Sequence, residues 1–236
     1  MTAITQYLAA TGFKEFRPKA ALIDMDGTLY DSMPRHADAW MEMCRQAGLD
    51  AEHDEFFLHE GRTGAATIDI LMRRTFGRPA TDKEKKELYA IKSAACAAMP
   101  PVDPMPGAAR MLRTLADAGI TRVLVTGSGQ ATLLNRLDSD FPGAFSPGLR
   151  ITSADVSRGK PDPEPYLRAM SMAGVEPWQS IVIENAPLGV QSGVAAKAFT
   201  VAVTTGPIPR EAFVEAGASL IMPSMPDFAD LLPTIL

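Results

Sequence analysis

The order of apolar and polar positions predicts short strands alternating with helices. Apolar runs at 20–23, 122–125, 180–183, 199–203 and 220–222 have the length of buried strands, and 151–152 is a weaker candidate. Between them, apolar residues recur at helical spacing at 111–118, 133–137, 166–173 and 188–196. Asp162 and Pro163 are the predicted N-cap and first residue of the helix that runs to 173. Strands alternating with helices favour a parallel α/β sheet with right-handed crossovers.

The stretch from 33 to 104 has a different pattern and contains no strand signal. Apolar residues follow helical spacing at 37–47 and at 65–76, and Thr81-Asp82-Lys83-Glu84 predicts a capping box for a third helix that runs to Met99. A proline-rich segment at 100–107 ends this stretch. We therefore predict a helical insert at 33–104 within a core made of 1–32 and 105–236, with a short N-terminal helix on the edge of the core.

Composition narrows the classes of function. The net charge of −5 and a hydrophobic content of 46% fit a packed protein with no electrostatic footprint for nucleic acid or an anionic membrane. No apolar run approaches the ~20 residues of a transmembrane helix, and no signal peptide is evident. Two distant cysteines without metal-ligand spacing fit a reduced, cytoplasmic protein.

Polar side chains follow the predicted strands at the points where ligands bind in parallel sheets. Three groups come directly after strands, and Lys160 stands in the loop before the helix that begins at 163; the three groups are Asp24 with Asp26, Thr126-Gly127-Ser128, and Glu184 with Asn185. The carboxyl ends of parallel strands meet at one edge of a sheet, so these groups are expected to lie together.

Phosphoryl transfer is the chemistry that these groups would perform together. Asp24 is the expected nucleophile, since a carboxylate attacks phosphorus to form an acyl phosphate. Asp26 is the expected acid and base for the leaving alkoxide and for water. Mg²⁺ would bind Asp24 together with an acidic group from another strand, for which Glu184 is available.

The remaining groups would hold the phosphoryl group in place. Thr126 and the amides of Gly127 and Ser128 are expected to bind its oxygens, helped by the N-terminus of the following helix. Lys160 would neutralise the nucleophile and the transferred group. An Asp-rich turn after a strand is the competing explanation for the first group alone.

Four motifs in order resemble the haloacid dehalogenase (HAD) superfamily, in the branch of β-phosphoglucomutase-like phosphatases. They are Asp-Met-Asp-Gly-Thr-Leu-Tyr-Asp-Ser (24–32), Val-Thr-Gly-Ser (125–128), Gly-Lys-Pro-Asp-Pro (159–163) and Ile-Val-Ile-Glu-Asn-Ala-Pro-Leu-Gly-Val (181–190). The resemblance implies a Rossmann-like core with an inserted all-helical cap. It also implies a phosphoric monoester hydrolase with Asp24 as nucleophile, Asp26 as acid and base with its carbonyl on Mg²⁺, Thr126 as phosphate ligand, Lys160 as charge clamp and Glu184 in the metal site.

The fourth motif departs from the branch, which usually has two adjacent acids there. Asn185 stands in place of the second acid. An amide oxygen still coordinates a metal or binds a metal-bound water, but it adds no charge. Weaker metal binding is therefore expected, and a protein that binds a phosphometabolite without turnover stays an alternative.

The insert would determine which substrate is bound, and its residues match the family less well than the core motifs do. His36 and Lys92 stand where β-phosphoglucomutase-like enzymes place a hinge histidine and a cap lysine, although both positions also suit a surface residue. Arg62 is a candidate ligand for a substrate phosphate or carboxylate, but it is out of register with the arginine of mutase caps. The expected function is a Mg²⁺-dependent phosphatase of a small phosphorylated metabolite, as a monomer or weak dimer. A hexose-phosphate mutase and an inorganic pyrophosphatase are the alternatives.

Overall fold

A single parallel sheet organises the protein, as the sequence predicts. The computed structural model describes residues 2–127, 131–146 and 148–236. Within these residues the strands are β1 (Ala20–Ile23), β2 (Thr121–Val125), β3 (Arg150–Ile151), β4 (Ser180–Glu184), β5 (Phe199–Val203) and β6 (Leu220–Met222). They pair in parallel in the order β3-β2-β1-β4-β5-β6. The fold is α/β and Rossmann-like, and the weak strand candidate lies one residue earlier than predicted.

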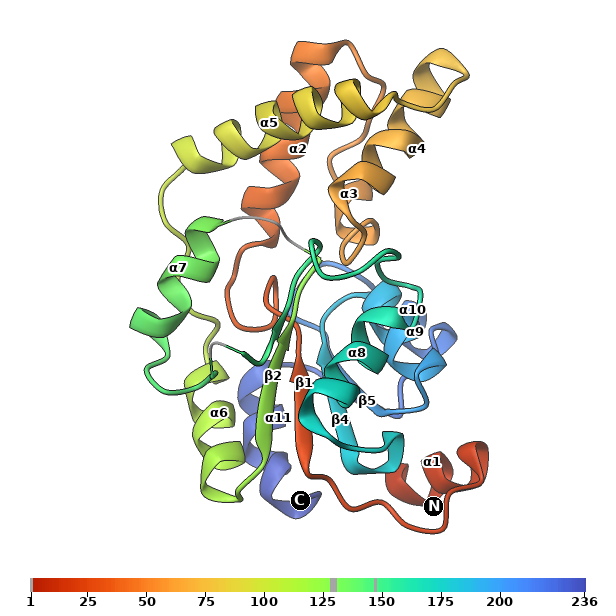
Figure 1. Ribbon diagram of the computed structural model, residues 1–236, viewed down its shortest axis with the longest axis vertical. Coiled ribbons are helices and arrows are strands. Elements are labelled where there is room, and N and C mark those ends of the chain that lie inside the picture. Colours follow the sequence, from red (N-terminus) through yellow and green to blue (C-terminus); the bar gives the residue numbers. More distant parts are fainter. Residues whose placement is uncertain (1, 128–130, 147) are drawn as a thin grey trace.

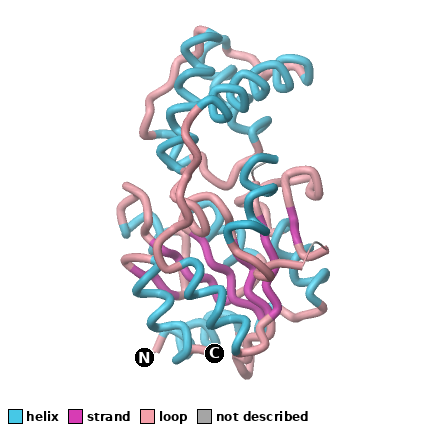
Figure 2. The backbone as a smooth tube through the Cα atoms, turned by 90° about the vertical axis from the view of Figure 1, so that its left-hand side faces the viewer, coloured by secondary structure: helices cyan, strands magenta, loops and turns pink. Residues whose placement is uncertain are grey.

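Helices cover both faces of this sheet (Figures 1 and 2). They are α1 (Ala3–Thr11), α6 (Ala108–Asp117), α7 (Ala131–Asp140), α8 (Glu164–Ala173), α9 (Pro187–Ala195), α10 (Arg210–Glu215) and α11 (Met225–Leu231). Alternate residues of β1 point to opposite faces, as the period of a strand requires. Ala21 and Ile23 pack in the core that includes α6 and α11, while Ala20 and Leu22 pack with residues of α8.

The helices of the predicted insert gather beyond the carboxyl ends of the strands (Figure 1). They are α2 (Met33–Ala47), α3 (Glu55–Leu58), α4 (Gly64–Phe76) and α5 (Asp82–Ala98). The two chain segments that connect them to the sheet run side by side: the Asp31 amide donates to the Asp103 carbonyl at 3.1 Å, and the Met105 amide donates to the Leu29 carbonyl at 2.8 Å. The limits of the insert as a domain stay a prediction.

Some local predictions need correction or addition. Helix α8 has Pro163 at its N-cap instead of Asp162, whose Oδ1 accepts from the backbone amide of Glu164 at 2.9 Å. The short helices α3, α10 and α11 were not predicted, because four to seven residues hold too few apolar positions to show a period. The predicted N-terminal helix is present as α1, and its Tyr7 ring packs edge-on against Phe199.

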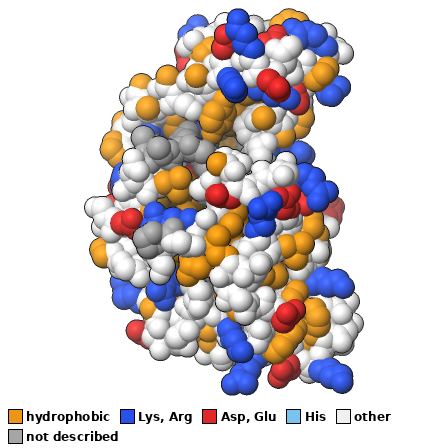
Figure 3. Space-filling view, in the orientation of Figure 1, with side chains coloured by type: hydrophobic (Ala, Val, Ile, Leu, Met, Phe, Trp, Pro, Cys, Tyr) orange, Lys and Arg blue, Asp and Glu red, His pale blue; other side chains and the backbone are white. Residues whose placement is uncertain are grey.

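On the face in Figure 3, Lys and Arg side chains are interspersed with Asp and Glu and form no broad basic area. Among the residues described here, no helix is both long enough and apolar enough to cross a membrane.

The predicted capping box of α5 is present and gives a test of its stability. Thr81 Oγ1 accepts from the Glu84 amide at 3.3 Å, and Glu84 Oε2 accepts from the Thr81 amide at 2.7 Å. We expect Thr81→Ala to lower the free energy of unfolding by about 1 kcal/mol, measured by urea denaturation. The exposed Lys86 of the same helix is the control, since Lys86→Ala should change that free energy by less than about 0.5 kcal/mol. Equal stabilities of the two variants would contradict a contribution from the box.

Candidate active site

One buried ammonium group joins the ends of three neighbouring strands. Lys160, only 3% exposed, comes from the loop before α8. Its Nζ lies 2.6 Å from Asp24 Oδ1, 2.5 Å from Glu184 Oε1 and 3.1 Å from the Val125 carbonyl oxygen. Asp24 follows β1, Val125 ends β2 and Glu184 ends β4. The structure therefore brings these predicted strand-end groups together with Lys160.

Asp24 is left with one oxygen that the described residues do not satisfy. The residue is 4% exposed, and its Oδ2 is buried without a hydrogen-bond partner in the described part of the chain. Burial raises the pKa of Asp24 to about 8 against the opposing effect of Lys160, and the negative charges of Glu184 and Asp26 add to the rise. A second positive charge at Oδ2 would restore the ionised form that a nucleophile needs.

Glu184 is held in place on both of its oxygens. The Tyr166 hydroxyl donates to Oε1 at 2.5 Å, and the backbone amide of Asn185 donates to Oε2 at 3.2 Å. Gly189 leaves room for this carboxylate, because a Cβ at that position would lie 2.0 Å from Glu184 Oε1. In this arrangement Glu184 positions Lys160, and its predicted role as a metal ligand stays a prediction.

Asn185 lies under the turn that carries Asp26. Gly27 has a φ of 79°, and a Cβ there would lie 1.9 Å from Asn185 Nδ2, so only glycine fits. Asn185 Oδ1 accepts from the Thr28 hydroxyl at 3.3 Å, and Nδ2 donates to Glu60 Oε2 at 3.0 Å. The side-chain amide of Asn185 therefore connects the end of β4 to the loop that follows α3.

Asp26 is held in its ionised form by a chain of buried groups. Its Oδ1 accepts from the Ser32 hydroxyl at 2.7 Å and lies 2.9 Å from His36 Nε2. Lys92 Nζ lies 2.8 Å from His36 Nδ1, so that a neutral His36 accepts from Lys92 and donates to Asp26. The sequence left the roles of both residues open; the structure buries them and connects them to Asp26.

The pKa values of this chain follow from burial and from its charges. Burial acts to raise the pKa of Asp26, but His36, Ser32 and Lys92 outweigh it and lower the pKa to about 2. Burial, followed by the charge of Lys92, lowers the pKa of His36, and burial lowers the pKa of Lys92 to about 8.

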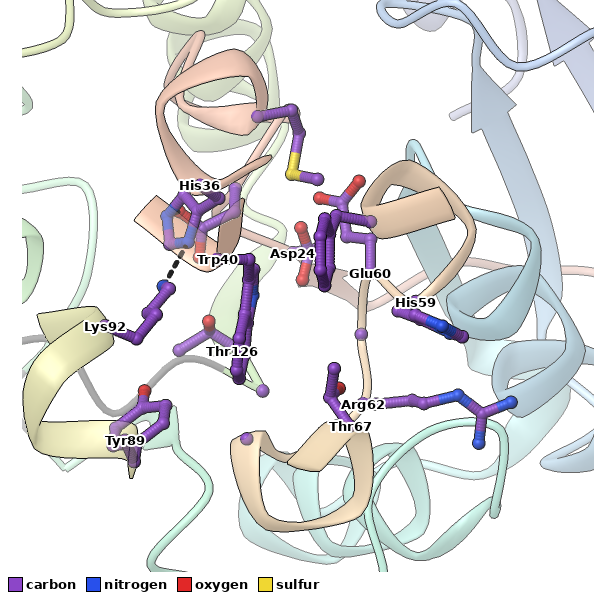
Figure 4. A pocket seen from close by; sticks show the side chains of 16 residues that line it. Asp24, His36, Trp40, His59, Glu60, Arg62, Thr67, Tyr89, Lys92 and Thr126 are labelled. Atoms are coloured by element: carbon purple, nitrogen blue, oxygen red, sulfur yellow. Dashed lines mark hydrogen bonds and ion pairs between the residues drawn. The ribbon is translucent and has the colours of Figure 1, made fainter. Parts of the chain in front are cut away.

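A pocket of about 60 Å³ lies over Asp24, between the sheet and the helices of the insert (Figure 4). Its lining includes the predicted residues Asp24, Asp26, His36, Arg62, Lys92, Thr126 and Gly127. Thr126 follows β2 and is buried. In the view of Figure 4 the Arg62 side chain runs away from Asp24, and its role as a substrate ligand stays a prediction. Ser128 lies outside the described residues.

The donors around Asp24 fit a hard divalent cation. Carboxylate, amide and carbonyl oxygens are the ligands that Mg²⁺ takes, and Asp24 Oδ2 is a buried carboxylate oxygen in need of a partner. Within the described ranges, no three His, Cys, Asp or Glu side chains are arranged to hold a metal by themselves. A cation would therefore also need the Asn185 amide, the Asp26 carbonyl or water.

Sequence reasoning missed three residues that shape this site. Tyr166 was assigned to the apolar face of a helix, and Ser32 was quoted only as part of a motif. Glu60 has no expected role in the sequence, although it lines the pocket. An acid directly before a glycine in an otherwise helical stretch is the signal that marks Glu60.

The comparisons with known proteins agree with this geometry. Residues 18–197 match the family profile described as haloacid dehalogenase-like hydrolase. Hexitol phosphatase A of Escherichia coli is 33% identical over 187 residues, which cover 79% of this chain and 83% of that protein. The 2-deoxyglucose-6-phosphate phosphatase 1 of Saccharomyces cerevisiae is 29% identical over 224 residues and 88% of each chain.

A solved structure from Bacteroides vulgatus, described as "Putative beta-phosphoglucomutase", is similar over almost the whole length. It is 46% identical with a TM-score of 0.95 and covers 99% of this chain and 95% of that one.

The packing of Gly189 against Glu184 gives a test of the site. We expect Gly189→Ala to lower the free energy of unfolding by about 2 kcal/mol, because the added methyl group would displace the carboxylate that holds Lys160. Gly206→Ala is the matched control, since nothing lies within 4 Å of a Cβ there. Urea denaturation compares the two variants. A Gly189→Ala variant as stable as the control would contradict the displacement of Glu184 by the added methyl group.

Proposed function

This chain belongs to the haloacid dehalogenase-like hydrolase family, and we propose that it is a Mg²⁺-dependent phosphatase of a small phosphorylated metabolite, a sugar phosphate or a similar compound, which acts through a phospho-aspartate intermediate. The observation that carries the proposal is the position of Asp24. Its carboxylate is buried directly after β1 and lines the pocket; Lys160 binds one oxygen, and the other has no hydrogen-bond partner among the described residues.

Asp24 acts as the nucleophile in the first half of the reaction. Its oxygen attacks the phosphorus of the substrate, a new oxygen–phosphorus bond forms, and the bond from phosphorus to the leaving alkoxide breaks. Lys160 keeps the attacking carboxylate oriented and offsets charge on the transferred group, and Thr126 with the Gly127 backbone binds its oxygens.

Asp26 acts as the general acid and then as the general base. The protonated carboxyl group gives its proton to the leaving alkoxide, and the resulting carboxylate takes a proton from the water that hydrolyses the phospho-aspartate. His36 and Ser32 stabilise the carboxylate form through their hydrogen bonds, which suits the second half. A dianionic phosphoryl group beside Asp26 raises the pKa of that carboxyl group and so favours the proton-carrying form.

A magnesium ion would be held by Asp24, the Asp26 carbonyl and Asn185, with Glu184 as the remaining acid of the predicted set. Bound there, it would neutralise charge on the phosphoryl oxygens.

The substrate class comes from the relatives. Two relatives are named for phosphatase activity on a hexitol phosphate or a deoxyhexose phosphate. The pocket is lined by residues of both the core and the insert, so the helical insert would move to admit a sugar phosphate and to release the product. Closure then excludes bulk water while the transfer takes place.

A hexose-phosphate mutase is the second candidate. The name given to the Bacteroides vulgatus structure supports it, as does the contact from Lys92 through His36 to Asp26. A mutase would need a sugar bisphosphate and would release little phosphate.

Replacement of the nucleophile tests the proposal. With Mg²⁺ present, we expect the wild-type protein to release phosphate from some members of a panel of hexose phosphates, hexitol phosphates, phosphoglycolate, nucleotides and pyrophosphate. We expect Asp24→Asn to lower that rate by at least about a thousandfold, since loss of a covalent nucleophile removes the whole pathway. The control is Asp117→Asn, which changes an exposed carboxylate on α6.

Each outcome separates the candidates. Release by the wild type and by Asp117→Asn, but not by Asp24→Asn, supports the phosphatase. Interconversion of hexose phosphates only when a bisphosphate is added supports the mutase. Binding of the panel without either reaction would overturn both in favour of a non-catalytic binding protein.

A further inference from the structure

We propose that Glu60, on the loop after α3, supplies from the helical insert the acidic cation ligand that Asn185 does not supply from the core, so that the Mg²⁺ site is complete only when the insert is closed over the sheet. The inference rests on the proposed cation of this site, but its test does not depend on turnover.

Two buried carboxylate oxygens have no hydrogen-bond partner among the described residues. They are Asp24 Oδ2 and Glu60 Oε1, and both belong to residues that line the pocket. Figure 4 shows the Glu60 side chain reaching from its loop toward Asp24. An unpaired carboxylate oxygen buried away from water is costly, and two of them facing one cavity are the arrangement that a shared cation would satisfy.

The charges around this cavity lead to the same conclusion. The negative charges of Asp24, Glu184 and Asp26 oppose a charge on the Glu60 carboxylate. Lys160 binds Asp24 and Glu184, and Lys92 reaches Asp26 through His36. The carboxylates outnumber the ammonium groups that pair with them, and a bound divalent cation would favour their ionised forms.

Asn185 explains why the acid is able to come from the insert. Its Nδ2 donates to Glu60 Oε2 at 3.0 Å, so the amide draws the carboxylate into the site. An aspartate at 185 would place a second negative charge against Glu60 and repel it. The departure from two adjacent acids in the fourth motif therefore moves one acid from the core to the insert.

The Glu60 loop is packed closely against the core. A Cβ on Gly127 would lie 2.8 Å from the Gly61 carbonyl oxygen, and a Cβ on Gly159 would lie 2.8 Å from the Thr63 side chain. The loop therefore fits against glycines of two core loops, and in this position Glu60 reaches the site.

Titration of the full chain with Mg²⁺ alone, by isothermal calorimetry, tests the proposal. We expect Glu60→Gln to raise the Kd for Mg²⁺ about tenfold or more, the scale seen when groups that support a metal site are removed. The double variant Glu60→Gln/Asn185→Asp returns the acid to the core and should recover most of the affinity. Glu87→Gln, an exposed acid on α5, is the control and should bind as the wild type does.

Small-angle X-ray scattering tests whether the acidic ligand comes from the insert. Mg²⁺ should make the wild-type chain more compact but should not compact the double variant, because its acid no longer links the insert to the core. A Kd for Glu60→Gln equal to that of the wild type, in a variant whose thermal unfolding is unchanged, would overturn the inference, as would equal compaction of the double variant.

The outcome is separable from that of the proposed function. A wild-type protein that binds Mg²⁺ through Glu60 but releases no phosphate from any substrate would leave this inference standing while the phosphatase failed. Phosphate release by a wild-type protein whose Mg²⁺ affinity does not depend on Glu60 would do the reverse.

Discussion

The burial of one lysine ammonium group determines the geometry of this site. Lys160 Nζ reaches a carboxylate after β1, a carbonyl of β2 and a carboxylate of β4, which are three adjacent strands. A buried charge is stable only when its hydrogen bonds are complete, so the three strand ends and the Lys160 loop must keep a fixed relation. Removal of Lys160 would leave two buried carboxylates without their compensating charge. The position of Asp24 is therefore a property of the whole central sheet.

The parts of the site that belong to the sheet could be predicted from the sequence. Asp24, Thr126 and Glu184 each follow an apolar run of strand length, and the parallel geometry of such runs brings their carboxyl ends to one edge. The helical insert could be predicted as well, since apolar residues at helical spacing fill most of it. The local errors are a strand one residue earlier than predicted, three short helices, and the start of α8, where Pro163 and not Asp162 is the N-cap.

The parts that depend on packing between distant segments could not be predicted. His36 and Lys92 meet only because α2 and α5 pack together, and no spacing in the sequence records that contact. Tyr166 has the pattern of a core residue because its ring is buried in the core, but its hydroxyl donates to Glu184. Glu60 follows a helix of one turn, and its role depends on where that loop settles on the core.

The glycines where the Glu60 loop meets the core limit which substitutions that contact tolerates. A Cβ on Gly127 would lie 2.8 Å from the Gly61 carbonyl oxygen, and a Cβ on Gly159 would lie 2.8 Å from a Thr63 side-chain carbon. A side chain at either core position would therefore push the loop away from the sheet. Such a substitution would displace Glu60 without changing any acid of the site.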